Sequence, residues 1–282
     1  MWLWMSVCSA LLLGVYDVAK KQALKRNGVY WILVSATALT AVFLSPFLSH
    51  GSLMDHLSLV LKAVLVSTSW VSGLYAMKHL PLTTVSTIKA SRPMFVVIFS
   101  ILLFGERLNL LQWLGVALVM AALFLSSRSK RHDTDKETSA KGMTCMVISV
   151  LSGSASALYD KYILQHLEPL FVQSWTNIYI TVLLAVVMLV QYLADRQKFE
   201  PFHWDWRIPL IAVLITVSDM LYFHSVKDPD ALLSVISMIR RSSVLITFLV
   251  GALLFKEGHI KDQALDMALM MAGLALLLSG SA

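Results

Sequence analysis

The stretch that decides the architecture is residues 86–126, STIKASRPMFVVIFSILLFGERLNLLQWLGVALVMAALFLS, because a second copy of it follows later in the chain. That copy is residues 237–277, SMIRRSSVLITFLVGALLFKEGHIKDQALDMALMMAGLALL, which align without a gap and share 15 of 41 residues. A common apolar composition accounts for about a third of these identities. The polar matches carry the rest of the argument for an internal repeat.

The polar matches recur with the same spacing in both copies. The motif SxIKxS at 86–91 corresponds to SxIRxS at 237–242, and the motif LLFxE ends at Glu106 in one copy and at Glu257 in the other. Further matched pairs are Tyr16-Asp17 with Tyr159-Asp160, and Leu74-Tyr75 with Leu221-Tyr222. We therefore expect the whole chain to be one helical unit that occurs twice.

The composition indicates that the solvent of this chain is a lipid bilayer. Hydrophobic residues make up 57% of the sequence and charged residues 14%, with a mean hydropathy of +0.72. A span needs about 20 apolar residues. The chain divides into ten such runs, at 2–22, 29–49, 57–78, 81–104, 108–126, 142–164, 169–193, 208–226, 231–255 and 263–280. The sequence predicts an all-α membrane protein with ten transmembrane helices.

One long polar stretch follows the fifth run and divides the chain near its middle. The predicted organisation is a first five-helix repeat at 1–126, a polar linker loop at 127–141 and a second five-helix repeat at 142–282. Because five is an odd number, the second copy must cross the membrane in the opposite sense. This predicts two inverted repeats, an architecture typical of carriers that work by alternating access.

The basic residues lie mostly between the apolar runs, where they anchor helix ends to lipid headgroups, and this argues against nucleic-acid binding. The odd-numbered connections hold 15 of the 23 Lys and Arg residues. The positive-inside rule then places these connections in the cytoplasm and both termini outside. The two cysteines, Cys8 and Cys145, lie within apolar runs without metal-ligand spacing, so we expect no metal site there.

The chain resembles the drug/metabolite transporter superfamily, in particular its EamA-type members with ten helices. The resemblance rests on a polar cluster in the first helix (Gly14-Val-Tyr-Asp17-Val-Ala-Lys20), on Pro93 thirteen residues before Glu106, and on Ala-Leu-Tyr159 in the sixth run. It implies a multi-pass transporter, which we expect in the bacterial inner (plasma) membrane. The family is usually drawn with both termini in the cytoplasm, opposite to the orientation that the charges predict.

Charges at membrane depth single out the candidate substrate site. A charge at the centre of a span costs about 2.5–3.5 kcal/mol on insertion scales. The deep charges are Lys89 and Arg92 in the fourth run, Asp219 in the eighth, and Arg240 and Arg241 in the ninth. They either pair with one another to fix helix packing, or bind a ligand. Because four cations face one deep acid, unless Asp17 and Asp160 also reach inward, we expect an anionic substrate between the two basic sites.

Other polar residues complete the candidate site. Tyr75, Tyr222 and Trp175 are expected to line the same cavity. Asp17 and Asp160 occupy matching positions near the ends of the first and sixth helices. Each is either a proton-coupling carboxylate or an interfacial partner of a nearby lysine, Lys20 for Asp17 and Lys161 for Asp160. Glu106 begins the fifth predicted helix, so its expected role is structural, at the positive end of that helix dipole.

The predicted function is secondary active transport of a small polar metabolite, driven by a proton or a counter-substrate. No catalytic residue, cofactor or metal is expected, because the sequence lacks zinc, phosphate-loop and nucleophile motifs. His50 and Asp55 have an HxxxxD spacing that some acyltransferases use, without a companion site. Two alternatives remain: a membrane-embedded enzyme acting on a lipid headgroup, and a non-transporting scaffold or sensor. The sequence does not define the oligomeric state.

Overall fold

The computed structural model describes residues 1–23, 26–79, 88, 91–128, 136–194, 202–243 and 260–281. Within these ranges all regular structure is helical, with ten α helices and one short 3-10 helix, η1. Their bounds are α1 Trp2–Ala23, α2 Val29–Leu44, η1 Ser45–Phe47, α3 Leu53–His79, α5 Arg92–Phe104, α6 Leu110–Arg128, α7 Lys136–Leu164, α8 Pro169–Ala194, α9 Arg207–Lys227, α10 Leu233–Arg241 and α12 Ile260–Ser281. The predicted all-α class is therefore confirmed for the described residues.

Five of the described helices are long and apolar enough to cross a membrane: Trp2–Lys20, Val29–Phe47, Ala140–Leu164, Pro169–Ala194 and Arg207–Lys227. Three shorter apolar helices, Arg92–Phe104, Leu110–Ala122 and Ala268–Ser281, overlap three further predicted spans. Two predicted spans are only partly covered, because residues 81–87 and 244–255 lie outside the described residues. The number of ten transmembrane helices therefore stays a prediction.

Polar side chains lie inside the helix bundle, and large apolar ones cover its outside. Lys62 and Asp160 are 2% and 6% exposed, whereas Leu102 and Leu193 are 70% and 74% exposed. A large apolar exterior is unfavourable in water. In a bilayer it is favourable, and the polar groups then lie inside, where they find partners within the protein. The distribution indicates an integral membrane protein.

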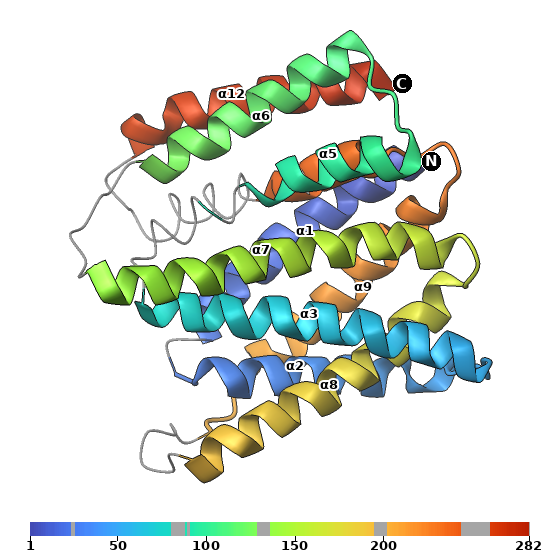
Figure 1. Cartoon of the computed structure of the whole chain (residues 1–282), viewed down its shortest axis with the longest axis vertical. Helices are drawn as coiled ribbons and strands as arrows, with labels where there is room; N and C mark the ends of the chain where they lie inside the picture. Colours follow the sequence, from blue (N-terminus) through green and yellow to red (C-terminus); the bar gives the residue numbers. More distant parts are fainter. Residues whose placement is uncertain are drawn as a thin grey trace.

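The two halves pack against each other in matched pairs. Helix α3 of the first half packs on α7 of the second, and α1 packs on α9. Helices α2 and α8 contact each other, as do α5 and α10, and α6 and α12 lie side by side (Figure 1). If α1, α2, α3, α5 and α6 are exchanged for α7, α8, α9, α10 and α12, the α3–α7 and α1–α9 contacts map onto each other, and the other three contacts map onto themselves. Both chain ends lie on the same side of the bundle (Figure 1).

Serine pairs join the helices at two of these contacts. Ser9 Oγ donates to the carbonyl of Ser218 at 2.8 Å, and Ser218 Oγ donates back to the carbonyl of Ser9 at 2.9 Å. Ser69 and Ser149 exchange the same two bonds, at 2.7 and 2.6 Å, between α3 and α7. Small hydroxyl side chains permit close approach of two helices and satisfy their own polar groups there.

Two glycines bring α6 and α12 into direct backbone contact. A Cβ at Gly115 would lie 2.8 Å from the carbonyl oxygen of Gly273, and a Cβ at Gly273 would lie 2.9 Å from that of Gly115. Any larger residue would force the helices apart, so this pair depends on glycine at both positions.

Helix α5 has clear signals at both ends. Pro93 lies in its first turn, where a missing backbone N–H costs nothing. Gly105 ends the helix in the left-handed conformation, with φ of 64°, and its N–H donates to the carbonyl of Ile101. This sharp ending turns the chain inward, so that the next residue, Glu106, is buried rather than exposed.

Candidate functional site

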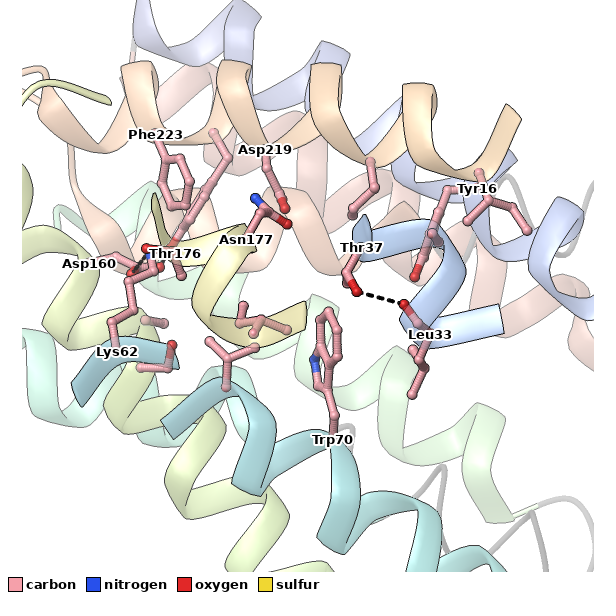
Figure 2. A pocket seen from close by; sticks show the side chains of 18 of the residues that line it. Tyr16, Leu33, Thr37, Lys62, Trp70, Asp160, Thr176, Asn177, Asp219 and Phe223 are labelled. Carbon is pink, nitrogen blue, oxygen red and sulfur yellow. Dashed lines mark hydrogen bonds and ion pairs between the residues drawn. The ribbon is translucent and has the colours of Figure 1, made fainter. Parts of the chain in front are cut away.

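A cavity lies between the two halves, near the middle of the bundle. Its larger part has a volume of about 470 Å³, and an adjoining lobe has about 160 Å³. Trp70, Arg92, Asp219, Tyr222 and Arg240 line both parts, so the two parts adjoin and share these walls. Figure 2 shows the smaller lobe with Trp70 projecting into it from α3.

Most of the predicted site residues meet at this cavity. Arg92, Asp219, Tyr222 and Arg240 line both parts of it. Asp17 and Arg241 line the larger part, and Asp160 lines the smaller lobe. Lys89 lies outside the described residues. The arginines of α5 and α10 thus face one space, although they are far apart in the sequence.

Tyr75 and Trp175 are not among the residues that line the cavity. The hydroxyl of Tyr75 accepts a hydrogen bond from Gln191 at 2.6 Å, and the same amide donates to Tyr30 at 2.8 Å. Trp175 donates from Nε1 to the carbonyl of Ser49 at 3.0 Å and packs edge-on against His56. Both aromatic residues contact other parts of the bundle, so their predicted role in binding remains a prediction.

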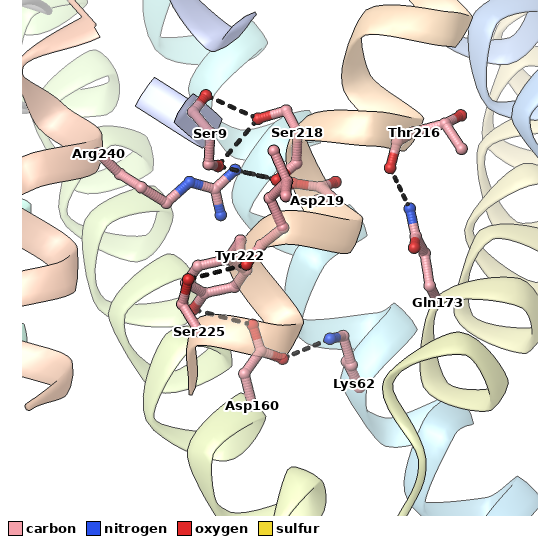
Figure 3. Close-up of polar contacts among 11 residues, drawn as sticks. Ser9, Lys62, Asp160, Gln173, Thr216, Ser218, Asp219, Tyr222, Ser225 and Arg240 are labelled. Carbon is pink, nitrogen blue, oxygen red and sulfur yellow. Dashed lines mark hydrogen bonds and ion pairs between the residues drawn. The ribbon is translucent and has the colours of Figure 1, made fainter. Parts of the chain in front are cut away.

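Asp219 and Arg240 form an ion pair at the wall of the cavity. The Arg240 guanidinium donates to Asp219 Oδ1 at 2.7 Å and lies 4.0 Å above the centre of the Tyr222 ring (Figure 3). Their side chains are 18% and 29% exposed, so both groups reach the open space. The sequence left open whether the deep charges pair with one another. In this structure Arg240 does so, with Asp219.

A second, more deeply buried ion pair joins Lys62 of α3 to Asp160 of α7. The Lys62 ammonium donates to Asp160 Oδ1 and lies 4.0 Å from the centre of the Phe223 ring. The hydroxyl of Tyr222 donates to the other carboxylate oxygen of Asp160 at 3.3 Å (Figure 3). Because the Tyr222 ring also lies under Arg240, this tyrosine connects the two ion pairs.

The sequence interpretation missed Lys62. The available signal was that Lys62 is the one charged residue between positions 57 and 77, within a predicted span. A cation at that depth requires a partner or a ligand. The suggested interfacial partner of Asp160 was also wrong, because the neighbouring Lys161 pairs with Glu106 instead, at 2.8 Å.

Arg92 and Arg241 are two further cations of the cavity. Arg92 donates to the carbonyl of Gly153 and makes no ion pair within the described part of the chain. It lies within electrostatic range of both Arg240 and Arg241. Arg241 interacts electrostatically with Asp17, and its buried Nε has no hydrogen-bond partner in the structure as described.

The cavity wall carries an excess of positive charge. Five cations, Lys20, Lys62, Arg92, Arg240 and Arg241, face three carboxylates, Asp17, Asp160 and Asp219, among the described lining residues. Like charges repel strongly in a space with little water. An anionic ligand would relieve that repulsion with charge-assisted hydrogen bonds.

Asp55, half of the HxxxxD spacing, has a structural role at the start of α3. Its carboxylate accepts a hydrogen bond from the backbone N–H of Ser52 at 2.9 Å, while its own N–H donates to Ser52 Oγ at 3.2 Å. Hydrogen bonding of the carboxylate with the side chain and the backbone N–H of Ser52 holds the pKa of Asp55 below its ordinary value. A carboxylate used in this way is a helix cap, and the described residues show no group of three potential metal ligands either.

Comparisons with known proteins agree with this arrangement. A family model for EamA-like transporters matches residues 1–128 and 140–279, which is most of the chain. One solved crystal structure, of a protein whose description names no function, superposes with a TM-score of 0.78 at 13% identity. That match covers 98% of this chain and 95% of the other. At so low an identity the likeness establishes the fold alone. No curated protein matches the sequence.

Proposed function

Because the chain belongs to the EamA-like transporter family, it is a multi-pass membrane transporter of the drug/metabolite transporter superfamily, and we propose that it carries a small anionic metabolite. Its substrate site is the cavity between the two halves, and it works by alternating access. The observation that carries the proposal is the excess of cations over carboxylates on the cavity wall.

The geometry of Arg92, Arg240 and Arg241 supports an anion as the cargo. Guanidinium groups bind phosphate and carboxylate oxygens through two parallel hydrogen bonds, which a lone ammonium does not provide. Arg92 approaches from α5 and the other two from α10, so a ligand between them would contact both halves at once. Contact with both halves is what a carrier needs for substrate to influence its conformational equilibrium.

The exchangeable packing supports the inverted repeat that alternating access requires. Most contacts between the two halves have a counterpart with the roles of the halves exchanged: α3–α8 corresponds to α2–α9, and α5–α7 corresponds to α1–α10. Two copies of opposite orientation give inward-open and outward-open states of similar energy. We place the odd-numbered connections in the cytoplasm, following the charges between the predicted spans. We place the chain in a bacterial inner membrane, following the family resemblance.

Asp17 and Asp160 are the proposed coupling carboxylates. Asp17 is electrostatically coupled to Lys20 and Arg241, and Asp160 faces Lys62 and Tyr222. If a transported proton binds either acid, replacing that residue with Asn should abolish gradient-driven uptake and spare exchange of substrate for substrate. Full gradient-driven accumulation in both variants would remove these acids from the mechanism.

The first experiment is a thermal-shift screen of the purified protein. It compares metabolites that carry phosphate or carboxylate with neutral and cationic compounds of similar size. A ligand at a hundred times its dissociation constant adds about 2.7 kcal/mol of stability. We expect the largest shifts from anions, and we expect Arg92→Gln to reduce them. A cationic or neutral best ligand would overturn the anion proposal.

The two alternatives predict other outcomes for the ligand that the screen finds. A membrane-embedded enzyme would convert a lipid headgroup without net movement of solute into sealed liposomes. A scaffold or sensor would bind the ligand and neither convert nor move it. The HxxxxD spacing lends no support to the enzyme, since Asp55 is engaged as a helix cap.

A further inference from the structure

A buried carboxylate of the first half holds the start of α10 in the second half. Glu106 Oε1 accepts the backbone N–H of Leu233 at 2.7 Å. Its Oε2 accepts the backbone N–H of Ser234 at 3.1 Å and the Ser234 hydroxyl at 2.5 Å. Glu106 therefore caps α10 and not α6, the helix that follows it in the sequence and that we expected it to stabilise.

Lys161 of α7 completes this arrangement. Its ammonium donates to Glu106 Oε1 at 2.8 Å and to the carbonyl of Ala231 at 2.9 Å. The side chains of Glu106 and Lys161 are only 3% and 13% exposed. We call the four residues Glu106, Lys161, Leu233 and Ser234 the α10 clasp. It links three segments: the α5–α6 connection, the end of α7 and the start of α10.

Helix α10 depends on this clasp because it has no cap of its own. The residue at its N-cap position is Leu232, which makes no side-chain capping bond. The helix is nine residues long, and helices this short are marginal without tertiary contacts. A carboxylate at the N-terminus satisfies free backbone donors and opposes the positive end of the helix dipole.

The other end of α10 reaches the cavity. Arg240 and Arg241 lie in its last turn, and nine residues of helix span about 13 Å. Leu233, within the clasp, and Ser237, one turn before the arginines, also line the larger part of the cavity. One short rigid segment thus connects a residue of the first half to the two arginines of the second.

We propose that Glu106 is a positioning residue: by capping α10 across the two halves, it fixes where Arg240 and Arg241 stand in the cavity. Glu106 does not contact the ligand. If α10 shifts between conformations, the hydrogen bonds of the α10 clasp must either break or move with it. Because Glu106 belongs to the connection between α5 and α6, that connection then influences ligand affinity. The effect on affinity rests on the proposed anion transport, whereas the positioning itself does not.

The test uses a single cysteine at Ser237→Cys, in a chain whose native Cys8 and Cys145 are replaced by serine. In Glu106→Gln the charge of the cap is lost, so we expect faster reaction of the cysteine with a thiol reagent, because α10 is no longer held. Affinity for the best anion of the screen should fall about tenfold. Glu168→Gln serves as the matched control, since it removes an exposed ion pair with Lys227 and should change neither value.

Two further variants keep the proposal decidable. Ser234→Ala removes one hydroxyl bond to Glu106 and keeps every charge. It should therefore raise the labelling rate and lower the anion affinity by smaller amounts than Glu106→Gln. If Glu106→Gln does not fold, Ser234→Ala tests the positioning role by itself. Glu106→Asp keeps the charge and should recover part of the wild-type labelling rate. Unchanged labelling in both Glu106→Gln and Ser234→Ala would overturn the positioning role. If the unaltered protein binds no anion while Glu106→Gln still alters labelling, the anion proposal fails and the positioning role stands.

Discussion

Helix α10 carries a carboxylate–cation pair at each end, and the two pairs differ in their surroundings. At the start of α10, Glu106 is 3% exposed, and its oxygens accept two backbone N–H groups, a hydroxyl and an ammonium. At its end, Asp219 is 29% exposed and accepts a hydrogen bond from Arg240. The first pair is closed to a ligand, and the second opens onto the cavity.

The two pairs have the same chemistry, a carboxylate bound to a cation, but the degree of burial gives them different roles. A buried carboxylate with all its oxygens engaged has nothing to gain from a new partner, so it holds structure. A carboxylate at the wall of a cavity occupies a guanidinium that an anionic ligand also seeks. If the substrate is the proposed anion, Asp219 competes with it for Arg240, whereas Glu106, in its proposed positioning role, keeps Arg240 within reach.

The largest expected effect is on the free energy of unfolding, which should differ between variants of the Glu106–Lys161 pair and of the Asp219–Arg240 pair. Glu106→Ala leaves Lys161 as an uncompensated buried charge and should lower the free energy of unfolding by about 3–5 kcal/mol. Asp219→Ala should cost about 1 kcal/mol, because water in the cavity can solvate the released guanidinium. Denaturation in lipid micelles, followed by tryptophan fluorescence, measures both. Equal losses would show that the two pairs do not differ as described.

An intermediate effect is expected on ligand binding at the open pair. Arg240→Gln deletes a charged contact and should weaken binding of the best anion by about 1.5–3 kcal/mol, roughly ten- to a hundredfold. Lys89→Gln, at the matching position of the first half, should weaken anion binding by a similar amount. Isothermal titration with Glu168→Gln as control provides the measurement. Normal affinity in both variants would return these residues to a structural role.

The smallest expected effect is a gain in affinity. Asp219→Asn removes the competing carboxylate and adds to the positive excess of the cavity, so anion binding should tighten by about 1 kcal/mol, or about fivefold. Asp205→Asn is the matched control, because it weakens an ion pair with Arg207 that does not line the cavity. Weaker binding in Asp219→Asn would mean that Asp219 orients Arg240 rather than competing with the ligand.

Helix positions and the deep charges could be predicted from the sequence, since both follow from local runs of apolar residues. Arg92, Asp219 and Arg240 stand out because a charge within such a run is costly wherever the helix packs. A helix can extend beyond the apolar run that marks it: the candidate span Ala140–Leu164 agrees with the predicted run at 142–164, while α7 itself begins at Lys136.

Partners across the two halves could not be predicted in the same way. The sequence shows that Glu106 is near a helix start, but burial after Gly105 brings it to the start of α10 instead of α6. Lys62 and Asp160 are 98 positions apart and pair only because α3 packs on α7. Such pairs depend on which helices pack together, and the local pattern of residues gives no information about that.

The most direct test of the central claim is counterflow in sealed proteoliposomes. Vesicles preloaded with the best anionic ligand take up the labelled ligand against its gradient only if one site is exposed alternately to both sides. We predict accumulation with the unaltered protein, and none above protein-free vesicles with the double variant Arg92→Gln, Arg240→Gln. Undiminished counterflow in that variant, or counterflow only with a neutral or cationic ligand, would contradict an anion site between α5 and α10.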